Sequence, residues 1–164
     1  MGLDKLDFYL KNKWLILDTN FLMYAQNKVE IFDIFLKKIK ELKCQLVSCA
    51  FIRAEFLRSE PNNNLYQQKL DFLNELSVDD LPLNSFANII DGVISKGRDL
   101  RRKKYPVPGF VDACLMELVC MYASNLYIAT FNHKDFAYGL KRVAILPFEF
   151  SKEDVKVLGI YSAL

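Results

Sequence analysis

Four acidic residues of the sequence stand where their carboxylates can act together. Asp18 directly follows residues 14–17, Trp-Leu-Ile-Leu, a run that predicts a strand buried on both faces of a parallel sheet. Asp135 lies in a polar loop after a later predicted strand, Asp112 in the first turn of an apolar helix, and Glu55 among the apolar positions of another helix. Because open α/β sheets bind ligands at the carboxyl ends of their strands, we expect these carboxylates to converge on one crevice.

A cation is the partner that converging carboxylates require. Like charges a few ångströms apart raise each other's pKa, so four acids in one crevice do not all stay ionised without one. Oxygen ligands favour a hard ion, so we expect Mg²⁺ or Mn²⁺. Zinc is disfavoured, because the four cysteines show no C-x-x-C spacing and His133 is the single histidine. The alternative for each acid is a helix cap or a pair with a basic side chain such as Arg53.

The elements that must position these acids alternate between strand and helix. Apolar runs predict strands at 14–17, 44–49, 126–131 and 143–148 and a short one at 78–83, and helical periodicity predicts helices at 29–43, 50–60, 65–76, about 85–104 and 110–123. Thr19 and Asn20 suit the start of a further helix and can hold Asp18 by hydrogen bonds, and Asn84 and Ser85 can cap the fourth helix. We expect an α/β fold, a three-layer α/β/α sandwich with a mostly parallel central sheet.

Four short motifs around the acids follow one another along the chain. They are Leu-Asp-Thr-Asn at 17–20, Arg-Ala-Glu-Phe at 53–56, Asp-Ala-Cys-Leu at 112–115 and Thr-Phe-Asn-His-Lys-Asp-Phe at 130–136. In this order and in these settings the sequence resembles the PIN domain, and more narrowly the VapC-type ribonuclease toxins of toxin–antitoxin pairs, over a core of roughly residues 13–150. The resemblance implies a PIN-like fold and an endoribonuclease that acts on RNA and has an antitoxin protein as partner. It also implies that one or two Mg²⁺ or Mn²⁺ ions are held by Asp18, Glu55, Asp112 and Asp135.

The last motif carries two further positions of the resemblance. Thr130 matches the family's T-x-D/N position, which implies that it orients the nucleophile or a metal ligand. Asn132 stands where many members carry an acid. Two arrangements therefore stay open: Asp135 contacts the metal directly, or Asn132 is the ligand and Asp135 supports it. His133, which lies between these two residues, is expected to face solvent.

The densest positive charge of the chain lies in residues 96–105, directly before the segment that carries Asp112. Two interpretations stay open: a solvated helix end that complements the helix dipole, or a flank of the active crevice that holds RNA phosphates, with Tyr105 available for stacking. The candidates for phosphate contact are Arg98, Arg101, Arg102, Lys103 and Lys104, followed by Arg53 and Arg58. Glu117 points roughly 140° away from Asp112 around its helix, so we expect a structural role for it.

Size and composition indicate the number of domains, the location of the protein and the kind of partner it can bind. The 164 residues fit a single domain, 1–164, and no apolar run approaches the length of a membrane span. The charged N-terminal residues differ from a secretory signal, so we expect a cytoplasmic protein. The net charge is only +2, so affinity for nucleic acid requires a local patch. Surplus apolar positions on helices 29–43 and 65–76 offer a homodimer face or a groove for an antitoxin helix.

Other functions compete with that of a toxin-type nuclease. The same nuclease chemistry can serve RNA processing without an antitoxin. Because Asn132 replaces an acid, a catalytically weak PIN-fold module that binds RNA or protein also stays open. A phosphoryl-transfer enzyme is disfavoured, because the sequence has no Gly-rich phosphate loop and no Asp-x-Asp pair.

Overall fold

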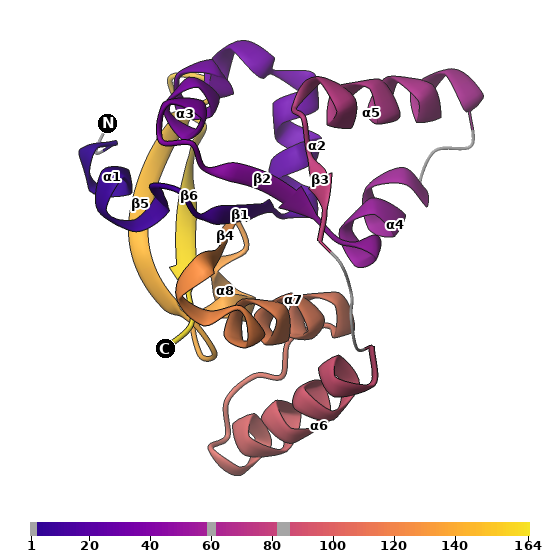
Figure 1. Ribbon diagram of the computed structural model, residues 1–164, viewed down its shortest axis with the longest axis vertical. Helices are drawn as coiled ribbons and strands as arrows, with labels where there is room; N and C mark the ends of the chain where they lie inside the picture. Colours follow the sequence, from indigo (N-terminus) through magenta and orange to yellow (C-terminus); the bar gives the residue numbers. More distant parts are fainter. Residues whose placement is uncertain (1–2, 59–61, 82–85) are drawn as a thin grey trace.

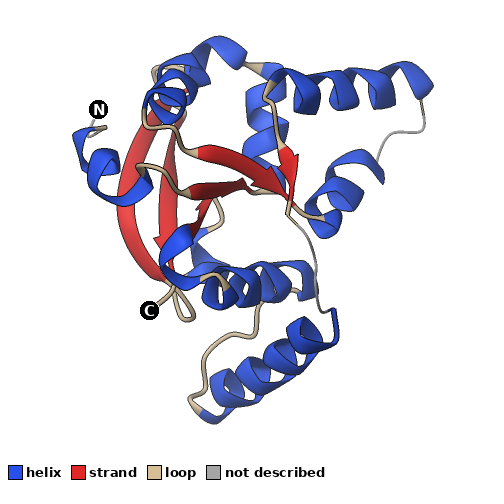
Figure 2. Cartoon of the chain, in the orientation of Figure 1, coloured by secondary structure: helices blue, strands red, loops and turns tan. Residues whose placement is uncertain are grey.

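The computed structural model describes residues 3–58, 62–81 and 86–164, which form an α/β fold around one six-stranded sheet (Figures 1 and 2). The strands are β1 (Trp14–Leu17), β2 (Gln45–Ser48), β3 (Asp79–Asp80), β4 (Leu126–Thr130), β5 (Lys141–Glu149) and β6 (Val155–Ser162). The helices are α1 (Asp4–Leu10), α2 (Thr19–Asn27), α3 (Val29–Glu41), α4 (Ala50–Arg58), α5 (Asn63–Glu75), α6 (Phe86–Arg102), α7 (Phe110–Met121) and α8 (His133–Phe136).

The sheet has the order β3-β2-β1-β4-β6-β5. Strands β3, β2, β1 and β4 are parallel, whereas β6 runs antiparallel to both β4 and β5. The mostly parallel α/β sheet is therefore confirmed. Residues 14–17 owe their central place to burial, because Leu15 and Ile16 are fully buried between the neighbouring strands and the helices.

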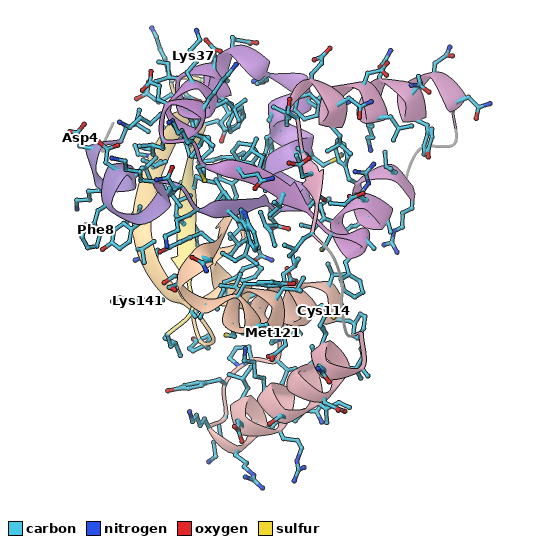
Figure 3. All side chains as sticks on the ribbon, in the orientation of Figure 1. Asp4, Phe8, Lys37, Cys114, Met121 and Lys141 are labelled. Atoms are coloured by element: carbon cyan, nitrogen blue, oxygen red, sulfur yellow. The ribbon has the colours of Figure 1, made fainter. Side chains whose placement is uncertain are left out.

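Helices cover both faces of the sheet. Figure 1 shows α2 and α3 over one face and α7 with α8 over the other, and side chains fill the space between the layers (Figure 3). Helix α6 packs against α7 on the side away from the sheet (Figure 1). The arrangement is compatible with the expected three-layer sandwich. In the described ranges, no helix is both long and apolar enough to cross a membrane.

The boundaries of most predicted elements agree with the structure to within a few residues. Strand β6 was missed, and helix α8 forms where a polar loop was expected. The predicted strand at 143–148 is part of the longer β5, and the one at 78–83 shortens to β3 in the described residues. The expected caps of α6, Asn84 and Ser85, lie outside the described residues.

His133 is only partly exposed and lies on α8 rather than in a loop, and it ties α8 to β6. Its Nδ1 lies 2.7 Å from the Tyr161 hydroxyl and its Nε2 lies 2.7 Å from the Val157 carbonyl oxygen. A carbonyl only accepts, so the geometry assigns the proton of the neutral ring to Nε2 and makes Nδ1 the acceptor from Tyr161. Gly159, opposite Thr130 in the sheet, leaves room for both rings.

Gly159→Ala is expected to lower the free energy of unfolding by about 1–3 kcal/mol, because added volume in a packed site forces neighbours to move. A Cβ at this position would lie 2.6 Å from Tyr161 Cε2 and 2.8 Å from His133 Cε1. Urea unfolding measures the loss. Gly97→Ala on α6 is the matched control, since its Cβ would meet nothing closer than Val107 Cγ1 at 4.0 Å and alanine favours a helix by about 1 kcal/mol. Equal stability of Gly159→Ala and the wild type would refute this packing role.

Candidate functional site

The predicted acids surround the point where the order of the strands changes direction. From β1 the chain continues to β2 and β3 on one side, and β4 then pairs with β1 on the other side, with Leu17 opposite Ala129 (Figure 1). The carboxyl ends of β1 and β4 therefore form a topological switch point, the usual place for a ligand in an open α/β sheet. Asp18 follows β1 directly, and Thr130 is the last residue of β4.

Asp18 is the centre of a buried hydrogen-bond network. Asp18 is only 4% exposed to solvent. Oδ1 accepts a hydrogen bond from the Thr19 N–H (2.7 Å). Oδ2 accepts hydrogen bonds from Asn20 Nδ2 (2.6 Å) and from the Thr130 hydroxyl (2.6 Å). Burial raises the pKa of Asp18, and the negative charge of Glu55 adds to the rise, while these hydrogen bonds oppose it. Asp18 is therefore the N-cap of α2. Thr19 and Asn20 hold its carboxylate by hydrogen bonds, as the sequence predicted.

Thr130 connects Asp18 with the loop that follows β4. Its hydroxyl is fully buried and accepts the Asn132 N–H at 2.9 Å while donating to Asp18. Asn132 Nδ2 in turn donates to Asp135 Oδ2 at 2.6 Å. The network therefore runs from Asp18 to Asp135, and the Asn132 side chain presents its amide hydrogens to Asp135.

Glu55 joins the same network from helix α4. Its Oε2 accepts a hydrogen bond of 2.6 Å from Thr19 Oγ1, and the backbone N–H of Thr19 donates to Asp18. Thr19 was expected only to start a helix and to hold Asp18, so its bridging role is new. Its position next to an N-capping acid is the one signal that could have indicated this role.

Asp112, in the first turn of α7, is coupled to the other acids through charge. Burial raises the pKa of Asp112 to about 7, and the negative charges of Asp18, Asp135 and Glu55 contribute to the rise. Close neighbours of its carboxylate include Gly109, the N-cap of α7, whose added Cβ would lie 3.3 Å from Asp112 Oδ2. The structure thus brings all four predicted acids into electrostatic contact, from four separate elements.

The donor chemistry of this site fits a hard cation, although the carboxylates do not form a closed shell of ligands. Across residues 3–58, 62–81 and 86–164, no three or more His, Cys, Asp or Glu side chains are arranged to hold a metal ion. The four acids are nevertheless all oxygen donors, and burial together with the negative charges of the other three raises the pKa of Asp112 to about 7. A divalent cation would relieve the repulsion between these charges.

The chain matches no protein-family model, no curated protein sequence and no solved structure.

The predicted basic side chains lie mainly at the end of α6. Arg98 and Arg101 line a hollow of about 370 Å³ between α6 and α7, together with apolar side chains that include Phe110 and Met116. Tyr105 does not stand alone, because it stacks on Tyr138 with ring centroids 4.6 Å apart. All of the predicted basic residues from Arg98 to Lys104 are exposed.

Arg53, which was predicted to contact phosphate, has a surface partner. Its guanidinium lies 3.1 Å from Asp80 Oδ1 at the end of β3, where Asp80 is well exposed. Exposed ion pairs of this kind contribute little to stability, so the pair leaves Arg53 able to exchange its partner for a phosphate. Arg58, one turn further along α4, is exposed.

Proposed function

We propose that this protein is a PIN-type endoribonuclease that hydrolyses RNA phosphodiester bonds and acts as the toxin of a toxin–antitoxin pair. The observation that carries the proposal is the coupling of Asp112 to Asp18, Glu55 and Asp135 beside the carboxyl ends of β1 and β4. The order of the four sequence motifs supports the same class of nuclease.

Each residue of the site has a distinct task in this proposal. Asp18, Glu55, Asp112 and Asp135 would hold Mg²⁺ or Mn²⁺. When bound, the ion supplies an activated water and stabilises the negative charge that grows on the scissile phosphate. Asn132 donates to Asp135, which favours Asn132 as the support and Asp135 as the direct ligand. Thr130 and Thr19 hold the carboxylates of Asp18 and Glu55, so these acids are positioned before substrate arrives.

RNA cleavage by purified wild type and Asp112→Asn, measured side by side with Mg²⁺, with Mn²⁺ and with EDTA, tests the proposal. We expect cleavage that requires the metal and disappears in Asp112→Asn, because the variant loses a charged ligand. Asp91→Asn, which changes an exposed acid on α6, controls for loss of charge alone and is expected to cleave normally. Equal cleavage by Asp112→Asn and the wild type would exclude this mechanism.

The basic end of α6 is proposed to bind the RNA backbone. We expect the double substitution Arg98→Gln and Arg101→Gln to weaken RNA binding and to lower its salt dependence by about one unit of slope per lost phosphate contact. Fluorescence anisotropy in EDTA measures binding without cleavage. Lys37→Gln with Lys40→Gln, which removes the same charge from α3, is expected to leave the slope unchanged. An unchanged slope in the α6 variant would identify the basic run as a solvated helix end.

A module that binds RNA or protein without cleaving it is the second candidate. Two observations favour it: Asn132 occupies a position where an acid is expected, and the described residues hold no closed set of metal ligands. Absence of Mn²⁺ binding by the folded protein in a calorimetric titration would support this candidate. A nuclease of RNA processing differs from a toxin in having no antitoxin, so a small neighbouring reading frame for a DNA-binding protein separates those two roles.

The proposed partners would use exposed apolar side chains. Ile34 on α3 and Leu65 and Tyr66 on α5 are between 41% and 61% exposed, on the two helices where a homodimer face or an antitoxin groove is expected. Their exposure supports the proposal of such a face.

A further inference from the structure

Three side chains at the contact between α6 and α7 form a cluster that the proposed nuclease chemistry does not use. The Lys96 ammonium lies 2.9 Å from Glu117 Oε2 and 2.9 Å from Cys120 Sγ. Lys96 belongs to α6, and the other two belong to α7. Cys120 directly precedes Met121, which Figure 3 labels on α7. A thiol, an amine and a carboxylate thus meet within contact distance.

Cys120 differs from the other cysteines in its exposure. All four cysteines lie in the described residues, and Cys44, Cys49 and Cys114 are buried, with the pKa of each thiol raised by burial. Such thiols are inert, because the thiolate is the form that reacts. Cys120 is instead partly exposed, and its Sγ lies 2.9 Å from the Lys96 ammonium. Oxidants are therefore expected to select Cys120.

The backbone of α6 is shaped to accept Glu117. A Cβ on Gly92, one turn before Lys96, would overlap the Glu117 carboxylate, so the glycine makes room for this side chain against the helix. The Glu117 side chain is only 16% exposed, and its pairing with Lys96 agrees with the structural role expected for it. The carboxylate is therefore held close to Lys96 Nζ and can take a proton from it.

We propose that Cys120 and Lys96 are a site of oxidative modification, at which hydrogen peroxide links the two side chains by a sulfur–nitrogen bond. In the first step the Cys120 thiolate attacks peroxide and the O–O bond breaks. Sulfenic acid forms, and the leaving hydroxide takes a proton from solvent to become water, so sulfur is oxidised and peroxide reduced. In the second step Lys96 gives one proton to Glu117, and its nitrogen attacks sulfur. The S–O bond breaks, and the leaving hydroxide takes the proton from Glu117 to become water. The new S–N link releases a second proton to solvent.

The link would fasten α6 to α7 covalently. Helix α6 carries the basic run, and α7 carries Asp112, so oxidation would restrain the two elements that flank the candidate site. The modification itself does not depend on the proposed nuclease function, because it requires only the Cys120, Lys96 and Glu117 side chains.

Peptide mapping of the full-length protein after treatment with hydrogen peroxide tests the inference. We expect a tryptic species in which the peptides of Lys96 and Cys120 are joined with the loss of two hydrogens, with no cleavage after Lys96. Dithiothreitol is expected to restore both peptides. Cys44, Cys49 and Cys114 serve as internal controls and are expected to stay unmodified at the same peroxide concentration.

Two matched variants separate the cross-link from simple oxidation. Lys96→Arg keeps the positive charge but removes the amine, so it is expected to give sulfenic acid at Cys120 without a link. Lys103→Arg, which changes an exposed lysine after α6, is expected to form the link normally. A wild type in which Cys120 stays a free thiol, or is oxidised without any joined peptide, would overturn the inference, and this result needs no variant to fold.

Discussion

Asp18→Ala is expected to abolish RNA cleavage and to lower the free energy of unfolding by about 2–4 kcal/mol. The substitution leaves the buried Thr130 hydroxyl without its acceptor, and the partly buried Thr19 N–H and Asn20 amide lose theirs on Asp18. Each buried donor without a partner costs about 1–3 kcal/mol. The substitution also removes the cost of burying the Asp18 carboxylate, whose pKa is raised, and this offsets part of the lost stability. Urea unfolding and a cleavage assay with Mn²⁺ measure the two effects.

Asp18→Asn separates the loss of charge from the loss of the network. Asparagine keeps one acceptor oxygen, so this variant is expected to lose less stability than Asp18→Ala. It is still expected to lose cleavage by more than about 100-fold, because altering even the outer partners of metal ligands costs about 10–100-fold. Asp91→Asn again controls for charge. If Asp18→Ala cleaved RNA at the wild-type rate, Asp18 would not be part of the catalytic site.

The sequence predicted those parts of the site that local patterns encode. An apolar run followed by Asp18 indicated a central strand with an acid at its carboxyl end, and β1 and β4 lie side by side as this pattern requires. Helical periodicity placed Glu55 and Asp112 on helices that the structure contains. These signals are local, because burial of one face fixes the spacing of apolar residues along an element.

Contacts between distant segments could not be read from local patterns. Gly159 interrupts the strand pattern of β6. A glycine is needed there because His133 from α8 packs closely against this position. The bridge from Thr19 to Glu55 depends on how α2 and α4 pack, and 36 residues of sequence separate the two side chains. The same holds for Lys96 and Cys120. Each of these contacts is set by tertiary packing, which residue spacing along one element does not specify.

Asp112→Asn is expected to make the protein more stable at about pH 8 although it removes the proposed nuclease activity. The pKa of Asp112 is about 7 in the folded protein and near its ordinary value of 3.8 in the unfolded chain. Between these values the folded state keeps a proton that the unfolded state has lost, so the free energy of unfolding falls as pH rises through this window. The full penalty is present above pH 7 and absent below the unfolded pKa. Asparagine carries no charge and escapes the penalty.

The gain from Asp112→Asn is expected to be about 1–2 kcal/mol at about pH 8, because Asp112 is partly exposed, so solvent reduces both the cost of burying its charge and the repulsion from the other acids. Near pH 4 the two proteins are expected to be equally stable. Urea unfolding across this range measures both. Adding Mn²⁺ at pH 8 is expected to stabilise the wild type more than the variant, since a ligand that binds only the folded state raises its stability. If Asp112→Asn were instead less stable at pH 8, the Asp112 carboxylate would be making a stabilising contact, and a repulsive cluster that a cation must neutralise would be excluded.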